Sequence, residues 1–136
     1  MKPADLAERY VAVWNEADPE RRRDGIRNLW SADGAQVLEP PEEVREAGAA
    51  LGMIARLEAR GHDALEDRVS RAYHEFVEPG EFTFRARGNA SRLGDLVKFN
   101  WEMVRTEDGQ EAAVGLEILQ VDGDGRIILD YQFIER

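Results

Sequence analysis

Residues Val114 to Glu135 read VGLEILQVDGDGRIILDYQFIE and carry the clearest structural pattern in the chain. The pattern predicts two long strands joined at the DGDG turn. One stripe of the alternation is apolar throughout and consists of Val114, Leu116, Ile118, Ile127, Leu129, Tyr131 and Phe133. The other stripe mixes large aliphatic residues with three polar ones, Glu117, Asp130 and Gln132. Because both faces carry bulky aliphatic side chains, both are expected to be covered.

The three polar residues indicate a pocket on one of these faces. Carboxylates on a covered face need hydrogen-bond partners or a chemical role. The apolar setting of Glu117 also favours a buried position and a raised pKa. Two other interpretations stay open: Glu117, Asp130 and Gln132 could point to water on a half-exposed sheet, or Glu117 could pair with a cation such as Lys98.

The turn controls how the two strands face each other. A two-residue loop, residues 123–124, would pair Val121 with Arg126. That register sets Glu117 opposite Asp130 on one face. A three-residue loop would shift the register by one residue and put the two acids on opposite faces. The sequence leaves both registers open.

Composition limits the class of protein. At 136 residues the chain is expected to form one domain, residues 1–136, with a single core. Its net charge of −10 argues against a nucleic-acid partner or an anionic membrane surface. Because it has no cysteine, disulfides and zinc–sulfur sites are excluded. The start, MKPADLAERYVAVW, is typical of an amphipathic helix rather than a signal peptide, and no apolar run reaches membrane-spanning length, so a cytoplasmic protein is expected.

Helices are predicted for most of the N-terminal half. The first has an apolar face at helical spacing made of Leu6, Tyr10, Val13 and Trp14. A second opens with Asp18 as N-cap and Pro19 as its first residue, and ends at residues 31–34. Its inner face consists of Ile26, Leu29 and Trp30. A short strand, Ala35–Glu39, then runs to the pair Pro40-Pro41.

The remaining elements place a sheet after the helices. Residues 42–52 predict a short helix whose inner face is Val44, Ala47 and Leu51. After Gly61, a capping-box-like start at residues 63–66 opens a longer helix with apolar positions from Leu65 to Phe76. Four strands follow at about residues 81–91, 95–105, 111–121 and 126–134. Helices followed by an antiparallel meander predict an α+β fold.

The chain resembles the nuclear transport factor 2-like superfamily, and within it the SnoaL-like and ketosteroid-isomerase-like branches, over nearly its whole length. The resemblance rests on the order and spacing of RYVAVWNEAD (9–18), NLWSADGAQVLEP (28–40), GHDAL (61–65), LVKFNWEMV (96–104) and the GLEIL…DGRI…DYQF ending. It implies a cone-shaped α+β fold, in which N-terminal helices pack on a curved antiparallel sheet around a pocket. It also implies a homodimer through the outer sheet face, for which the seven-residue apolar stripe is suitable.

Three positions match the ketosteroid isomerase pattern in kind. The resemblance implies that Tyr10 is an oxyanion-hole donor, Glu39 the base, and Glu117 a protonated acid that donates to the oxyanion. The chemistry would be proton abstraction beside a carbonyl group. Both family aspartates are glutamates here, and Asp130 and Gln132 replace apolar groups, so a steroid substrate is not expected. Asp130 is an alternative acid or base of the SnoaL-like type.

The expected function is therefore a cofactor-independent isomerase, cyclase or dehydratase reaction on a small carbonyl compound. The candidate catalytic residues are Glu117, Asp130, Glu39 and Tyr10, and the candidate substrate-binding residues are Trp14, Phe99, Trp101 and Gln132. No metal site is expected, because His62 and His74 lack ligand spacing and fit structural or exposed roles. The alternative is a non-catalytic ligand-binding or dimer-forming accessory protein of the same fold. A weaker third option is a module that binds a partner through the apolar sheet face.

Overall fold

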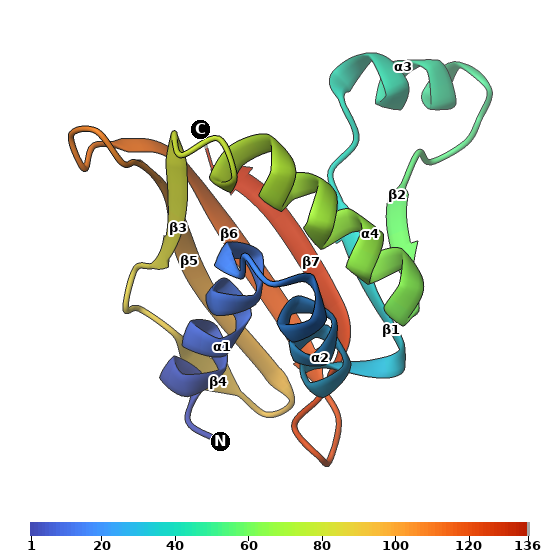
Figure 1. Ribbon diagram of the computed structural model, residues 1–136. Helices are drawn as coiled ribbons and strands as arrows, with labels where there is room; N and C mark the ends of the chain where they lie inside the picture. The colour runs from blue at the N-terminus through green and yellow to red at the C-terminus, as the bar shows by residue number, and fades with distance from the viewer. Residues whose placement is uncertain (136) are drawn as a thin grey trace.

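The computed structural model describes residues 1–135 (Figure 1). The helices are α1 (Pro3–Asn15), α2 (Pro19–Leu29), α3 (Glu42–Ala50) and α4 (His62–Ala72), which continues into a π-helical turn, η1 (Tyr73–Val77). The strands are β1 (Trp30–Leu38), β2 (Leu57–Arg60), β3 (Phe82–Ala86), β4 (Ser91–Leu93), β5 (Leu96–Arg105), β6 (Glu111–Val121) and β7 (Ile127–Glu135). Figure 1 shows α1, α2 and α4 lying across one face of the sheet. The expected α+β class is confirmed.

The strands form one mixed sheet rather than a purely antiparallel one. Their order is β2-β1-β7-β6-β5-β3, and β4 also pairs with β5. Every neighbouring pair is antiparallel except β1 and β7, which run parallel. The predicted meander therefore holds from β3 to β7, and β1 adds to it beside β7. After β1 and β2, α4 and η1 carry the chain across the sheet to its other edge, where β3 begins (Figure 1).

The core lies between the helices and the inner face of the sheet. The predicted face of α1 is buried, from Leu6 to Trp14. Asp18 caps α2 as expected, accepting a hydrogen bond from the Glu20 backbone N–H at 3.0 Å. Burial of these apolar residues is what holds helices of this length on the sheet. No helix within residues 1–135 is long and apolar enough to cross a membrane.

Trp30 corrects the predicted end of the second helix. The helix stops at Leu29, and Trp30 opens β1, where it pairs with Ile127 before an irregularity brings Ala35 opposite Leu129. The predicted strand therefore begins before Ala35. Trp30 is fully buried. A large aromatic residue fits the inner side of a helix or of a strand, so its apolar character did not distinguish the two.

The region around α3 departs further from the prediction. The helix forms, but its supposed inner residues Val44 and Leu51 are 43% and 76% exposed. In Figure 1, α3 stands clear of the other helices. Apolar spacing marks a buried face only where another element covers it. The sequence also gave no indication of β2, which pairs with β1.

The start of α4 differs from the predicted capping box. Gly61 is its N-cap, with φ of 88°, and no side chain in the described part of the chain caps the helix. That positive φ is one that glycine adopts without strain. Asp63 consequently lies in the first turn, where a negative charge favours the helix dipole.

The hairpin of β6 and β7 follows neither predicted register. Glu117 lies opposite Gln132, and Asp130 lies opposite Leu119. Because Asp130 and Gln132 are two residues apart on one strand, all three polar side chains still share one face. An irregularity near the turn makes Val121 pair with Ile127. Ile127 therefore joins the core instead of the outer stripe, while Ile128 is 38% exposed.

Candidate functional site

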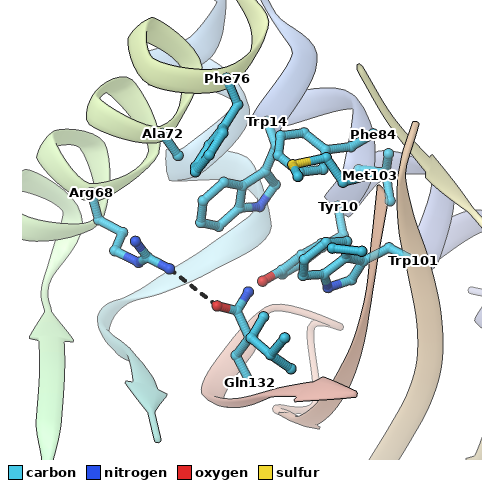
Figure 2. Close-up of a pocket in the computed structure, with 12 residues that line it drawn as sticks. Tyr10, Trp14, Arg68, Ala72, Phe76, Phe84, Trp101, Met103 and Gln132 are labelled. Carbon is cyan, nitrogen blue, oxygen red and sulfur yellow. Dashed lines mark hydrogen bonds between the residues drawn. The ribbon is translucent and has the colours of Figure 1, made fainter. Parts of the chain in front are cut away.

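A cavity of about 220 Å³ opens between α1, the α4–η1 segment and the inner face of the sheet. Most of its wall is apolar and includes Trp14, Phe76, Phe84, Trp101 and Met103. Three polar side chains also line it, Tyr10, Arg68 and Gln132. Figure 2 shows the hydroxyl of Tyr10 and the amide of Gln132 near each other, with Arg68 reaching Gln132 from α4.

Tyr10 is held rigidly by aromatic neighbours. It lies on the inner face of α1, and its ring contacts Phe99 edge-on at a centroid distance of 5.3 Å. The rings of Trp30 and Trp14 lie at 5.6 and 6.0 Å. Such packing fixes the ring and hence the position of its hydroxyl.

The Tyr10 hydroxyl meets two buried carboxyl groups. It hydrogen-bonds Oε1 of Glu117 through a short contact and Oδ2 of Asp130 at 2.6 Å. Nε2 of Gln36 also donates to the hydroxyl oxygen, at 3.0 Å. Glu117, Asp130 and Gln36 are all fully buried. We call Tyr10, Glu117 and Asp130 the acid cluster.

Counting hydrogens shows that the acid cluster needs an additional proton. The hydroxyl has one hydrogen, which it can donate to only one carboxylate. The other carboxyl group then has an oxygen that faces the hydroxyl oxygen, so this carboxyl must be protonated to donate a hydrogen bond. With one carboxyl protonated, the Tyr10 oxygen accepts from that acid and from Gln36 and donates to the other acid, and every contact is satisfied.

Burial raises the pKa values of the acid cluster. Desolvation and the nearby charge of Asp130 raise the pKa of Glu117 well above its usual value. Desolvation also raises the pKa of Asp130, to about 7, against the lowering effect of hydrogen bonds from Tyr10 and Gln36. Burial and both carboxylates raise the pKa of Tyr10 well above its usual value, so its hydroxyl stays protonated. The two acids therefore share a proton near neutral pH.

Arg68 orients the amides around the acid cluster. Its Nε donates to Oε1 of Gln36 at 2.8 Å, and its Nη2 donates to Oε1 of Gln132 at 3.1 Å. Both amide nitrogens consequently face the acids, and Nε2 of Gln132 donates to Oε1 of Glu117 at 2.9 Å. Nε1 of Trp101 is buried without a hydrogen-bond partner among residues 1–135.

The predicted acids lie behind the cavity wall rather than in it. Tyr10 and Gln132 line the cavity, whereas Glu117 and Asp130 do not. One oxygen of each acid, Oε2 of Glu117 and Oδ1 of Asp130, is buried without a hydrogen-bond partner among residues 1–135. A ligand in the cavity would therefore meet the acids through Tyr10 and Gln132.

The structure brings most of the candidate residues together. The burial and raised pKa expected for Glu117 are confirmed, and the interpretation that Glu117, Asp130 and Gln132 point to water is wrong. Lys98 is not a partner of Glu117, because it pairs with Ile118 on the other face.

Trp14 and Trp101 line the cavity as expected, but two other candidates do not. Phe99 packs against Tyr10 in the core and lies outside the cavity wall. Glu39 is exposed at the end of β1, beside Arg45 at 3.7 Å, and has no contact with the acid cluster. Its match to the family base was one of sequence position, and Glu39 follows the last residue of β1 without lining the cavity.

Two polar residues of the site were absent from the sequence prediction, Gln36 and Arg68. Arg68 could have been found, because it follows Leu65 by three residues and precedes Ala72 by four, on the inner face of α4. Gln36 gave a weaker signal, as one amide within a short apolar strand. Its partners are far away in sequence.

The histidines lie away from the acid cluster. Nε2 of His62 is 2.9 Å from the Trp30 carbonyl oxygen, and His74 is exposed beside Glu78. Within residues 1–135, no group of three or more His, Asp or Glu side chains is arranged to hold a metal ion.

No protein-family model matches the sequence, and no curated protein is significantly similar to it. Solved structures share its fold. A proposed isomerase of the SnoaL-like family from Agrobacterium tumefaciens is 22% identical, with a TM-score of 0.77 over 98% of this chain and 97% of that chain. A nuclear transport factor 2-like protein of unknown function from Exiguobacterium is 18% identical, with a TM-score of 0.64 over 96% and 98%.

A proposed polyketide cyclase from Sinorhizobium meliloti is 13% identical, with a TM-score of 0.59 over 95% of this chain and 94% of that chain. At these identities the likeness establishes the fold. The chain has the nuclear transport factor 2-like fold that the sequence resemblance implied, and its structural neighbours include SnoaL-like proteins.

Proposed function

We propose that this protein is a cofactor-independent acid/base enzyme that acts on a small carbonyl compound in the cavity. The observation that carries the proposal is the position of Tyr10, which lines the cavity while its hydroxyl binds both buried acids. Tyr10 thereby connects a bound ligand to groups that store a proton. Similar structures described as a proposed isomerase and a proposed polyketide cyclase agree with this class of reaction.

The Tyr10 hydroxyl would relay a proton between ligand and acids. When a substrate C–H beside the carbonyl gives up its proton, the Tyr10 oxygen accepts it on the lone pair that Gln36 occupies in the free protein, while the hydroxyl hydrogen moves to Asp130. The electron pair of the broken C–H bond forms the enolate. A pKa of about 7 suits Asp130 to accept and return a proton near neutral pH. Return of the proton to a different atom completes an isomerisation, and attack of the enolate on a second carbonyl completes a cyclisation.

The other cavity residues would bind the substrate. Trp14 and Trp101 offer flat apolar surfaces, and Gln132 offers a polar contact beside Tyr10. A cavity of about 150 Å³ accommodates benzene. The 220 Å³ here therefore suits a ligand of one ring or a compact pair of rings, and a steroid is too large to enter fully.

Replacement of Tyr10 by Phe tests the relay. The ring and its packing are retained, and only the hydroxyl is lost. We expect the wild-type protein to accelerate deuterium incorporation beside the carbonyl of a single-ring ketone or enone, followed by NMR in D₂O. In Tyr10→Phe the acceleration should fall about 10²- to 10⁴-fold, while the ligand dissociation constant changes little.

Tyr73→Phe is the matched control. Tyr73 is also buried, but its ring packs under Arg22 at 4.3 Å and lies outside the cavity wall. This variant should exchange deuterium at the wild-type rate. Equal rates for Tyr10→Phe and the wild-type protein, or no acceleration for any ketone shown to bind, would overturn the proposal.

A second function is a non-catalytic ligand-binding protein. The observation that favours it is that neither Glu117 nor Asp130 lines the cavity. Under this function the acid cluster only fixes Tyr10, and the cavity sequesters a small organic ligand. Tight ligand binding without deuterium exchange by the wild-type protein, whose Tyr10 hydroxyl is intact, would support this function over the enzyme.

We also propose that the protein is a homodimer through the outer face of the sheet, as the resemblance implied. The support is the row of apolar side chains that the helices leave uncovered, including Tyr131 and Phe133 at 37% and 40% exposure. The cytoplasmic location expected from the sequence stays a prediction.

A further inference from the structure

We infer that the cavity selects a small cyclic ligand that bears an anionic oxygen, and that Arg68 binds this oxygen. The inference deepens the proposed function, since it names the charge of the ligand in the same cavity. It concerns binding alone, so it can be tested where no turnover is found.

Arg68 is the charged side chain among the residues that line the cavity. It is half-buried on α4, above an otherwise apolar wall. Its guanidinium lies 5.4 Å from the centre of the Trp14 ring. A cation against an apolar surface attracts an anion more strongly than it would in water, because the local dielectric constant is low.

Within residues 1–135, no carboxylate lies at ion-pair distance from Arg68, although its charge acts on Asp130 from farther away. The two recorded hydrogen bonds of Arg68 go to the amide oxygens of Gln36 and Gln132. These neutral amides separate the guanidinium from Glu117 and Asp130. The remaining nitrogen, Nη1, has no hydrogen-bond partner within the described part of the chain.

With one proton on its two carboxyls, the acid cluster keeps one negative charge, but the neutral amides of Gln36 and Gln132 stand between this charge and the guanidinium, and the acids lie behind the cavity wall. The acid cluster holds at least one proton, as the single hydroxyl hydrogen of Tyr10 requires. Arg68 is also fixed by its two amide contacts, so little side-chain freedom is lost when it binds a ligand. A ligand oxygen with a negative charge would satisfy Nη1 and neutralise the cation.

Ligand shape follows from the cavity. Its volume of about 220 Å³ and its aromatic wall suit one ring. The shared chemistry is an anionic oxygen on that ring, and two sources provide it: a carboxylate, and the enolate of a cyclic 1,3-diketone. The protein has a net charge of −10, which disfavours anionic ligands in general. The cation in the apolar cavity favours them locally.

The test compares charged and neutral ligands of the same shape. Binding is measured by calorimetry at pH 7.5 with benzoate against benzamide, and with cyclohexane-1,3-dione against cyclohexanone. We expect the anionic member of at least one pair to bind at least about 10-fold more tightly to the wild-type protein. The pair that shows the difference identifies the source of the anionic oxygen.

Arg68→Met should remove this preference by weakening the anion about 10-fold or more while changing the neutral ligand by less than about 3-fold. Arg68→Lys keeps the charge and should retain part of the preference. Arg71→Met is the matched control, because Arg71 lies on the same helix but is exposed and paired with Asp67. It should leave every affinity unchanged.

Two results would overturn the inference. One is equal binding of anionic and neutral ligands by the wild-type protein, or binding of neither. The other is an equal loss for both ligands in Arg68→Met, since a structural role predicts that outcome. Circular dichroism of each variant shows whether it is folded. Failure of the deuterium-exchange test would leave an anion preference intact, so the two proposals can fail separately.

Discussion

The single hydrogen of the Tyr10 hydroxyl couples two carboxyl groups that cannot both be ionised at low cost. Glu117 and Asp130 each contact the hydroxyl oxygen, and each lies in the interior. Two negative charges at this separation, away from water, would repel each other strongly. The pair therefore titrates as a unit and keeps a proton over the physiological range.

This proton makes stability depend on pH. Unfolded, both carboxyls ionise near pH 4. Folded, burial raises the pKa of Asp130 to about 7 and also raises that of Glu117. Between these values the folded state binds more protons, so stability is greatest near the lower pH and is lost as pH rises through 7. We expect a lower Tm at pH 8 than at pH 5.5.

Glu117→Gln replaces the acid by a neutral group of the same shape and should flatten this decline. Glu102→Gln is a suitable control, since hydrogen bonding to Arg85 lowers the pKa of Glu102. A lowered pKa removes stability only as pH falls below about 4. A wild-type Tm that rises between pH 5.5 and 8, measured by calorimetry, would contradict the assignment of a shared proton.

Trp101, on β5, packs its indole over the neighbouring strand β6 and forms part of the cavity wall. Trp101 pairs with Gly115 across these strands, and its indole covers the glycine so closely that an added Cβ would overlap it. Gly115 thus sets the depth of the cavity on this side. Any larger residue pushes the indole into the space proposed for the ligand.

Gly115→Ala should therefore destabilise the protein and reduce ligand binding. Forcing extra volume into a packed site costs about 1–3 kcal/mol, and the displaced indole narrows the cavity. Thermal unfolding and quenching of tryptophan fluorescence by ligand measure the two effects. Gly123→Ala, in the turn with open space around it, should change neither. An unchanged affinity in Gly115→Ala would show that Trp101 does not bound the binding site.

At the scale of elements, the sequence patterns predicted those strands and faces whose side chains alternate between the core and the outside. Strand β6 agrees with the predicted range, because its alternation coincides with one buried and one outer face. The polar trio on β6 and β7 was predicted for the same reason. Helix α3 kept its spacing but has no covered face, so its pattern misled.

The polar network was harder to predict, because it depends on packing between distant elements. Arg68 contacts Gln36 across 32 residues and Gln132 across 64. No local periodicity encodes such contacts. The same holds for the irregular pairing near Ile127, which depends on the conformation of a turn and changed the register of the hairpin.

At the scale of the molecule, the helices cover only one face of the sheet (Figure 1). The opposite face carries large apolar side chains in contact with solvent, among them Tyr131 and Phe133. Exposed apolar surface of this kind is removed from water when two copies associate. Because the acid cluster lies on the inner face, association through the outer face would leave the cavity open in each copy.

A charge placed on the outer face should therefore separate the copies. We expect the wild-type protein to sediment as a dimer and Phe133→Lys as a monomer, because two lysines brought together at a two-fold interface repel and lose solvation. Ile54→Lys is the control, since Ile54 is 96% exposed but lies outside the sheet, between α3 and β2. It should remain a dimer. A monomeric wild-type protein at micromolar concentration, or a dimer that survives Phe133→Lys, would rule out this interface. Ligand binding by the Phe133→Lys monomer would in turn show that one copy contains the complete site.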